Sequence, residues 1–204
     1  MTGDRSVVLG GQNLSGVVSD TVYVPNFNSR GNSVFSGITT DVVKIYGSGT
    51  TTPIFSIQGS SGELFSVTDS LIGSLFSVND ISGLPILEAF SDNTILMGSY
   101  QAPSLNTTIK KLLSAGDNTV YSIPTSAYTG AFFDYTLISP TGARAGNVMA
   151  IWSGVTSQYT DVSTNDIGDT TGVILSVSVS GSSAIFSSSA NTSGWTLKTI
   201  VRSI

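Results

Sequence analysis

Carboxylates are the main side chains in this sequence that could do acid–base chemistry. The chain has 204 residues and contains no histidine and no cysteine, which excludes Ser-His-Asp and Cys-His catalytic arrangements and the common zinc sites. A carboxylate pair for glycosidic cleavage would have to come mainly from aspartates, because the sequence has only two glutamates. The candidate aspartates are Asp134, Asp161, Asp166 and Asp169. Nothing in the sequence fixes their separation, so we expect a protein that is not an enzyme and has no cofactor and no metal.

The densest acidic segment, DVSTNDIGD at residues 161–169, has two interpretations. It could bind calcium or hydrogen-bond to a sugar, or it could be a solvated turn in which Asp and Asn side chains cap the backbone. The segment lacks the alternating acidic order of a calcium loop, which favours the turn.

Two aromatic residues near this segment, Trp152 and Tyr159, could stack on a sugar ring. Large aromatic residues more often belong to a core or a subunit interface, and that alternative stays open for Trp152. Together with the acidic segment they give the candidate receptor-binding residues, which are Trp152, Tyr159, Asp161, Asp166 and Asp169.

A sequence repeat precedes these residues and predicts how the chain is built. Four lines begin at Ile54 (IFSIQGSSGE), Leu64 (LFSVTDSLIGS), Leu75 (LFSVNDISGLP) and Ile86 (ILEAFSDNT). Each line opens with an aliphatic residue, and the first three continue with aromatic, serine and aliphatic residues before a run rich in turn formers. Strict alternation would place apolar side chains on both faces of each short strand.

Strands that are apolar on both faces need cover on both faces. Lines about ten residues long are too short for one chain to close a β-helix around its own core. Three identical chains wound about a common axis could close it. We therefore predict an elongated homotrimeric β-helix or β-prism shaft with parallel rungs over residues 31–100. The predicted trimer core consists of Ile54, Phe55, Leu64, Phe65, Val67, Leu75, Phe76, Val78, Ile86 and Leu87. Ordinary strands of a monomeric sandwich are the alternative, since they show a similar spacing.

The pattern changes to longer strands beyond residue 118. Expected strands are 119–123, 131–138, 146–153, 156–162, 172–179, 184–188 and 195–203. They predict an antiparallel β-sandwich, jelly-roll-like, over residues 119–204. Alternation in the last strand places Trp195 on its apolar face, as a core residue. Residues 101–118 are expected to connect the two parts, and within them 107–115 could form either two helical turns or a strand.

Two motifs resemble known families. Residues 1–30 contain SVVLGGQN and TVYVPN, and they resemble the last coil and exit segment of trimeric adhesin heads and of related phage tail-fibre repeats. The FSV-x-D repeat at Phe65 and Phe76 is similar to segments of virion fibre proteins of tailed phages. The resemblance implies a structural protein on the surface of a virion, with a β-roll-like coil at residues 1–30 near the particle.

The same resemblance implies the partners. They are two further copies of the chain, another virion protein at the N-terminal end, and a host cell-surface glycan at the C-terminal tip. A trimeric capsid-decoration protein without a receptor role is the principal alternative. A cell-surface adhesin head and a glycan depolymerase are further alternatives.

Composition supports an ordered all-β protein and excludes several partners. Hydrophobic residues make up 40% of the chain and charged residues 10%, against about 25% charged in typical domains. Backbone ladders and packing, rather than salt bridges, must hold such a chain together. The net charge is −5 and the only basic pair is Lys110–Lys111, so no nucleic-acid partner is expected. No apolar run of membrane-spanning length and no signal-peptide pattern occur in the sequence, so no membrane insertion is expected.

Overall fold

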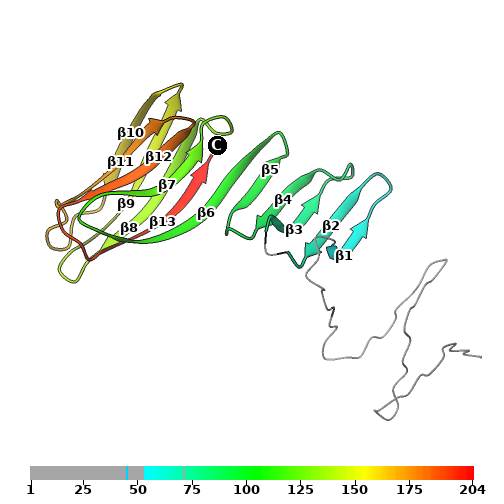
Figure 1. Cartoon of the computed structure of the whole chain (residues 1–204), viewed down its shortest axis with the longest axis horizontal. Coiled ribbons are helices and arrows are strands. Elements are labelled where there is room, and N and C mark those ends of the chain that lie inside the picture. The colour runs from blue at the N-terminus through cyan, green and yellow to red at the C-terminus, as the bar shows by residue number, and fades with distance from the viewer. Residues whose placement is uncertain (1–44, 46–52, 71) are drawn as a thin grey trace, which may run out of the picture. The chain divides into compact units, whose positions relative to one another are not determined.

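The computed structural model describes residues 45, 53–70 and 72–204, and these residues form an all-β structure (Figure 1). The strands are β1 (Pro53–Gln58), β2 (Glu63–Thr68), β3 (Ser74–Asn79), β4 (Pro85–Phe90), β5 (Ile95–Ser99), β6 (Ala102–Leu113), β7 (Gly116–Pro124), β8 (Gly130–Ile138), β9 (Ala143–Ser153), β10 (Thr156–Ser163), β11 (Val173–Ser180), β12 (Ser183–Ala190) and β13 (Trp195–Ser203). Within this part of the chain there is no helix that could cross a membrane. The predicted all-β class is confirmed. The predicted coil and exit segment at 1–30, and most of the predicted shaft before Pro53, lie outside the described residues.

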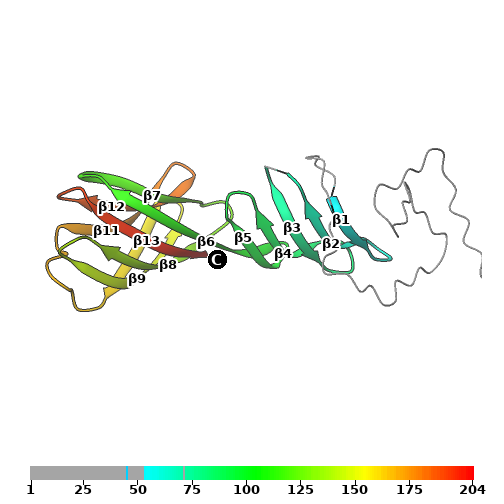
Figure 2. The same ribbon diagram turned by 90° about the horizontal axis from the view of Figure 1, so that it is seen from below.

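Strands β6 to β13 form a two-layered C-terminal domain. One layer has the order β6-β13-β8-β9-β10 and the other the order β11-β12-β7, and the strands of both layers are labelled in Figures 1 and 2. Their facing side chains form the buried core, in which the rings of Phe133 and Phe186 stack with centroids 4.2 Å apart. All seven strands expected beyond residue 118 are present, and they pair antiparallel in two sheets, one of which also contains β6.

Alternation along β11 and β13 follows the sequence pattern. Val173, Leu175 and Val177 are buried on β11, and Trp195 and Leu197 are buried on β13. The residues between them point outward, because successive side chains of a strand leave opposite faces. Trp195 is therefore a core residue, as predicted.

Strand β6 joins the repeat region to this domain. Its first residues, 102–106, pair with β5, and its residues 105–113 pair with β13. The segment 107–115, for which helix and strand were both open, is thus mainly strand. Residues 101–118 do not form a separate connector, because most of them belong to a strand shared by both parts.

Strands β1 to β5 form a meander in which each strand pairs antiparallel with the next. The prediction of parallel rungs is therefore wrong. The connections 59–62, 80–84 and 91–94 have hairpin length, whereas parallel neighbours need a crossover of a dozen or more residues. At the first of these turns a Cβ on Gly62 would lie 2.7 Å from the backbone nitrogen of Gly83, so glycine lets two neighbouring turns pack closely.

Candidate functional site

The aliphatic residue that opens each repeat line occupies a β-bulge. Pro53 pairs with Thr68 and Phe55 with Val67, which leaves Ile54 as the extra residue. The registers of the neighbouring pairs leave the corresponding residue unpaired in the other three lines, and these residues are Leu64, Leu75 and Ile86. A bulge places two residues opposite one and interrupts strict alternation.

The bulges separate polar from apolar side chains. Glu63 and Ser66 both line one groove although they are three positions apart, and Leu64 does not line it. Ser74 and Ser77 show the same spacing around Leu75. The expectation of two apolar faces is therefore wrong for β1–β4. One face is polar, and the apolar residues that follow the bulges share the other.

The face with those residues carries a continuous set of apolar side chains, which we call the apolar strip. Directly paired residues of antiparallel strands share a face, and the registers give the members of the strip as Phe55, Ile57, Phe65, Val67, Phe76, Val78, Leu87, Ala89, Ile95 and Met97. Edge-to-face contacts run along it, with ring centroids 5.8 Å apart for Phe55–Phe65 and 5.2 Å apart for Phe65–Phe76. Six of the ten predicted trimer-core residues lie in this strip, and the other four are the bulge residues.

No described strand covers the apolar strip (Figures 1 and 2). Phe55 is 42% exposed and Ile57 49% exposed. Among the described residues, the buried hydrophobic cluster starts only at Leu105, in β6. A sheet of this size needs packing on its apolar face for stability, and an exposed contiguous apolar patch generally marks an interaction surface.

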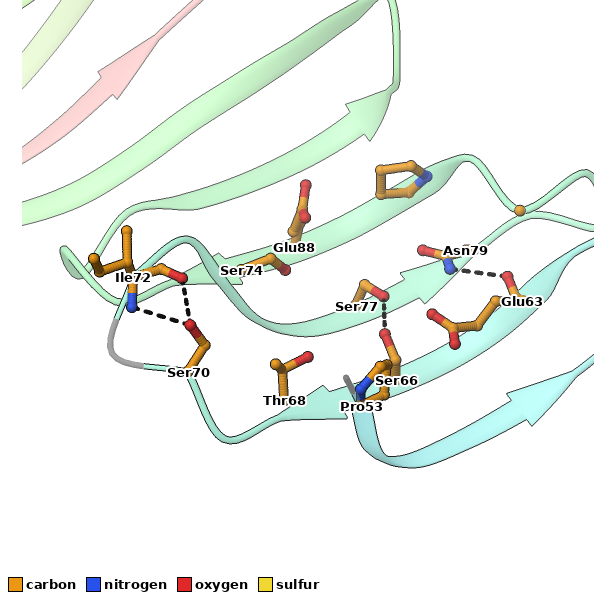
Figure 3. A pocket seen from close by; sticks show the side chains of 12 residues that line it. Pro53, Glu63, Ser66, Thr68, Ser70, Ile72, Ser74, Ser77, Asn79 and Glu88 are labelled. Atoms are coloured by element: carbon orange, nitrogen blue, oxygen red, sulfur yellow. Dashed lines mark hydrogen bonds between the residues drawn. The ribbon is translucent and has the colours of Figure 1, made fainter. Parts of the chain in front are cut away.

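The opposite face of the meander holds a polar depression of about 420 Å³, which we call the hydroxyl groove (Figure 3). It is lined by Pro53, Glu63, Ser66, Thr68, Ser70, Ile72, Ser74, Ser77, Asn79, Gly83, Pro85 and Glu88. At its centre the hydroxyl oxygens of Ser66 and Ser77 lie 2.8 Å apart, and both residues are buried. These serines pair directly between two copies of the sequence LFSV that run in opposite directions.

The groove offers hydrogen-bonding groups at its rim. The Asn79 amide nitrogen donates to the Glu63 backbone carbonyl over 2.8 Å, and the Asn79 Oδ1 atom is buried without a hydrogen-bond partner among the described residues. Both glutamates of the chain line the groove. In the adjacent turn Asp80 accepts hydrogen bonds from Ser82 and Leu84, and these bonds, chiefly that of the Ser82 hydroxyl, lower the pKa of Asp80.

The residues predicted to bind a receptor are spread over the C-terminal domain. Trp152 is 4% exposed, and its indole nitrogen donates to the Tyr128 carbonyl over 2.7 Å. Its ring belongs to the core, the alternative left open by the sequence, and this position does not favour stacking on a sugar. Tyr159 is 42% exposed and lines a shallow depression of about 400 Å³ with Phe132 and Met149.

The three acidic members of that set make contacts within the domain. Asp161 accepts a hydrogen bond of 2.9 Å from the Tyr135 hydroxyl. Asp166 accepts from the Thr170 hydroxyl, and Asp169 accepts from the backbone nitrogen and hydroxyl of Thr171. The Thr171 hydrogen bonds lower the pKa of Asp169. The turn interpretation of residues 161–169 holds only in part: Asp169 caps the backbone, whereas Asp161 lies on β10 and Asp166 accepts from a side chain.

Arg144 anchors this acidic segment to the core. Its guanidinium donates to the Thr170 carbonyl and hydroxyl and to the Val173 carbonyl over 2.9–3.2 Å, and it lies 4.0 Å from the Asp161 carboxylate. Burial, and next the hydrogen bond to Asp161, raises the pKa of Tyr135 to about 12. Both terminal guanidinium nitrogens of Arg144 are thus engaged within the domain, while its buried Nε has no hydrogen-bond partner among the described residues.

Comparison with known proteins gives one structural likeness. No protein-family model matches the sequence, and no curated protein matches it. The chain is similar to the crystal structure of the Acinetobacter phage vB_ApiP_P1 tailspike protein, with a TM-score of 0.33 and 12% sequence identity. The match covers 48% of this chain and 22% of the tailspike. A likeness at this level identifies neither a family nor a function.

Proposed function

We propose that this chain is a structural protein of a virus particle, a homotrimeric tail fibre or spike of a tailed phage with no catalytic role. The observation that carries the proposal is the uncovered apolar strip of β1–β5. The FSV-x-D repeat, which resembles virion fibre segments, lies on β2 and β3 of the same meander.

The meander supplies the contacts between subunits in this proposal. Three copies place their apolar strips against a common axis, and the hydroxyl groove of each copy then faces solvent. Burying one half-exposed Phe or Ile side chain contributes on the order of 1 kcal/mol, so several side chains from each of three copies give a stable assembly. The number three comes from the sequence resemblance, while the apolar strip itself requires only that a partner covers it.

The C-terminal domain serves as the host-facing tip in this proposal, and the N-terminal end attaches to another virion protein. Three tips on one fibre bind a host surface glycan through many weak contacts, so avidity supplies the affinity. The particle surface is therefore the proposed location, and no nucleic acid or membrane takes part.

A matched pair of substitutions tests the assembly. Ile57 lies in the apolar strip and is 49% exposed, whereas Ile174 on β11 is 63% exposed and lies outside the strip. Light scattering after size-exclusion chromatography should give the mass of three chains for the wild type and for Ile174→Ser. Ile57→Ser should weaken the trimer, and Phe76→Ser should dissociate it. A wild-type chain that elutes as a folded monomer at micromolar concentration overturns the proposal.

A density map of the whole virus particle tests where on the particle the protein lies. We expect the trimer at the tail or at a vertex. Trimers on many capsid three-fold axes would instead show a decoration protein.

A further inference from the structure

The outer face of the five-stranded layer in the C-terminal domain holds a depression of about 580 Å³ that none of the preceding assignments uses. Side chains that project from this face of β6, β13 and β8 surround it, and they are Thr108, Lys110, Asp134, Thr136, Lys198 and Ile200. Strand β13 runs through its middle, with Leu197 and Thr199 buried on the opposite face. The depression is therefore separated from the core by the sheet itself.

Two lysines stand directly opposite each other in this depression. Lys198 on β13 pairs with Lys110 on β6, and both side chains are exposed. Like charges that face each other across a strand pair destabilise a sheet. Two ammonium groups at this spacing in a chain of net charge −5 therefore form a local concentration of positive charge that folding alone does not favour.

The carboxylate that lines the depression is already engaged. Asp134 lies 3.5 Å from the Arg202 guanidinium and accepts a hydrogen bond of 2.6 Å from the Asn147 amide. Among the described residues neither Lys110 nor Lys198 takes part in an ion pair. Both ammonium groups are thus free for an external anion.

The surroundings of the lysines favour a sugar acid over a simple anion. Thr108 and Thr136 carry hydroxyls on the same face, where Thr136 stands opposite Lys198. Ile200, which is 50% exposed, stands opposite Thr108. A carboxylate can lie between the two ammonium groups while sugar hydroxyls meet the threonines and the C–H face of the ring covers Ile200. Two lysines are too few for the extended phosphate contacts that nucleic acids require.

We propose that this depression binds an acidic polysaccharide, through the carboxylates of its sugar units. The choice of a polymer rests on the proposed host-attachment role, while the site itself rests on the lysine pair. Three such sites on one trimer multiply a weak single-site affinity.

Binding of the full-length chain to immobilised polygalacturonate tests the inference, with neutral dextran as the control surface. Wild-type protein should bind polygalacturonate and not dextran, and the binding should weaken as salt is added. Lys110→Gln and Lys198→Gln should each lower the affinity about tenfold or more, because a charge-assisted contact is lost.

Lys111→Gln is the matched control. It removes the same charge from the neighbouring position, but Lys111 donates to the Thr119 carbonyl, and its backbone partner is the buried Leu197. It should leave binding unchanged. Equal losses for Lys111→Gln and Lys198→Gln would show a mere effect of net charge and would overturn the inference.

Lys198→Glu separates folding from binding. It places opposite charges across the strand pair, so the Tm should stay or rise while binding to polygalacturonate is lost. A wild-type trimer that does not bind polygalacturonate overturns the inference and leaves the assembly proposal intact. Displacement of the polymer by an equal concentration of inorganic phosphate would show a simple anion site, and a changed assembly mass of Lys198→Glu would show a subunit contact. Either result also overturns it.

Discussion

The meander β1–β5 and the C-terminal domain bury opposite kinds of side chain. In the C-terminal domain the largest fully buried residues are Phe133 and Phe186, both 0% exposed. In the meander the buried residues are Ser66 and Ser77, while the described apolar side chains there stay at least partly exposed. The C-terminal domain thus covers its own core, whereas the apolar strip of the meander is left uncovered by the described residues.

The largest expected effect comes from exchanging one phenylalanine in each region for alanine. Phe133→Ala removes a fully buried stacked ring, and it should lower the free energy of unfolding of the C-terminal domain by about 3–5 kcal/mol. Phe65→Ala should leave that free energy unchanged and weaken association instead. Urea unfolding and light scattering of both variants measure the two quantities. Equal losses of domain stability would remove the distinction between the regions.

A smaller effect is expected at the anchor of residues 161–169. Arg144→Gln removes the donors to Thr170 and Val173 and leaves the Asp161 carboxylate without its cation. The free energy of unfolding should fall by about 2–3 kcal/mol. Arg144→Lys should restore only part of it, because a single ammonium cannot reproduce the planar set of donors. Full restoration of stability by lysine would show that the positive charge alone, and not the planar set of donors, holds the segment.

The stability of the C-terminal domain should also depend on alkaline pH. Tyr135 has a pKa raised to about 12 in the fold, against about 10 in an unfolded chain. The contribution of Tyr135 to the free energy of unfolding is therefore complete below about pH 10, and it is lost as the pH rises through about 12. Burial also raises the pKa of Tyr121 and Tyr128, so Tyr135→Phe should reduce this alkaline loss without abolishing it. Urea unfolding at a series of alkaline pH values checks this, and an unchanged loss in Tyr135→Phe would contradict it.

The smallest effect is expected at the serine pair of the hydroxyl groove. Ser66→Ala or Ser77→Ala leaves one buried hydroxyl without its partner and should cost about 1 kcal/mol each. The double variant should cost less than the sum, since no unpaired hydroxyl remains. Thermal unfolding of the assembled protein in a double-mutant cycle gives the coupling energy. Strict additivity would show that the 2.8 Å contact does not stabilise the meander.

The C-terminal domain was predictable because its strands obey simple alternation. Val173, Leu175 and Val177 alternate with residues that face outward, and the buried positions follow directly. The layer partner of each strand was not predictable, because β13 pairs with β6 and β8, which lie far from it in the sequence.

The repeat region was predicted correctly as short strands and wrongly in its direction. A repeated LFSV motif suggests stacked parallel copies, yet Phe65 pairs with Val78 and Val67 with Phe76, so the two motifs run in opposite directions. The bulges at the opening aliphatic residues were also hidden, because alternation assumes an uninterrupted ladder. The hydroxyl groove was missed for the same reason, although the polar residue at the third position of the last three lines, Ser66, Ser77 and Glu88, was its visible signal.

The lysine pair illustrates a further limit. Lys110 and Lys198 are far apart in the sequence, and only the register of β6 with β13 brings them together. The two like charges can be recognised as a facing pair only once that register is known.

Sedimentation equilibrium of the purified wild-type chain at micromolar concentration tests the central claim most directly, namely that the apolar strip is covered by sister copies. We expect a single species with three times the 21.1 kDa mass of the chain, which holds together on dilution until the whole assembly dissociates. A folded species with the mass of one chain would contradict the account, because the apolar strip would then be stable in water without a partner.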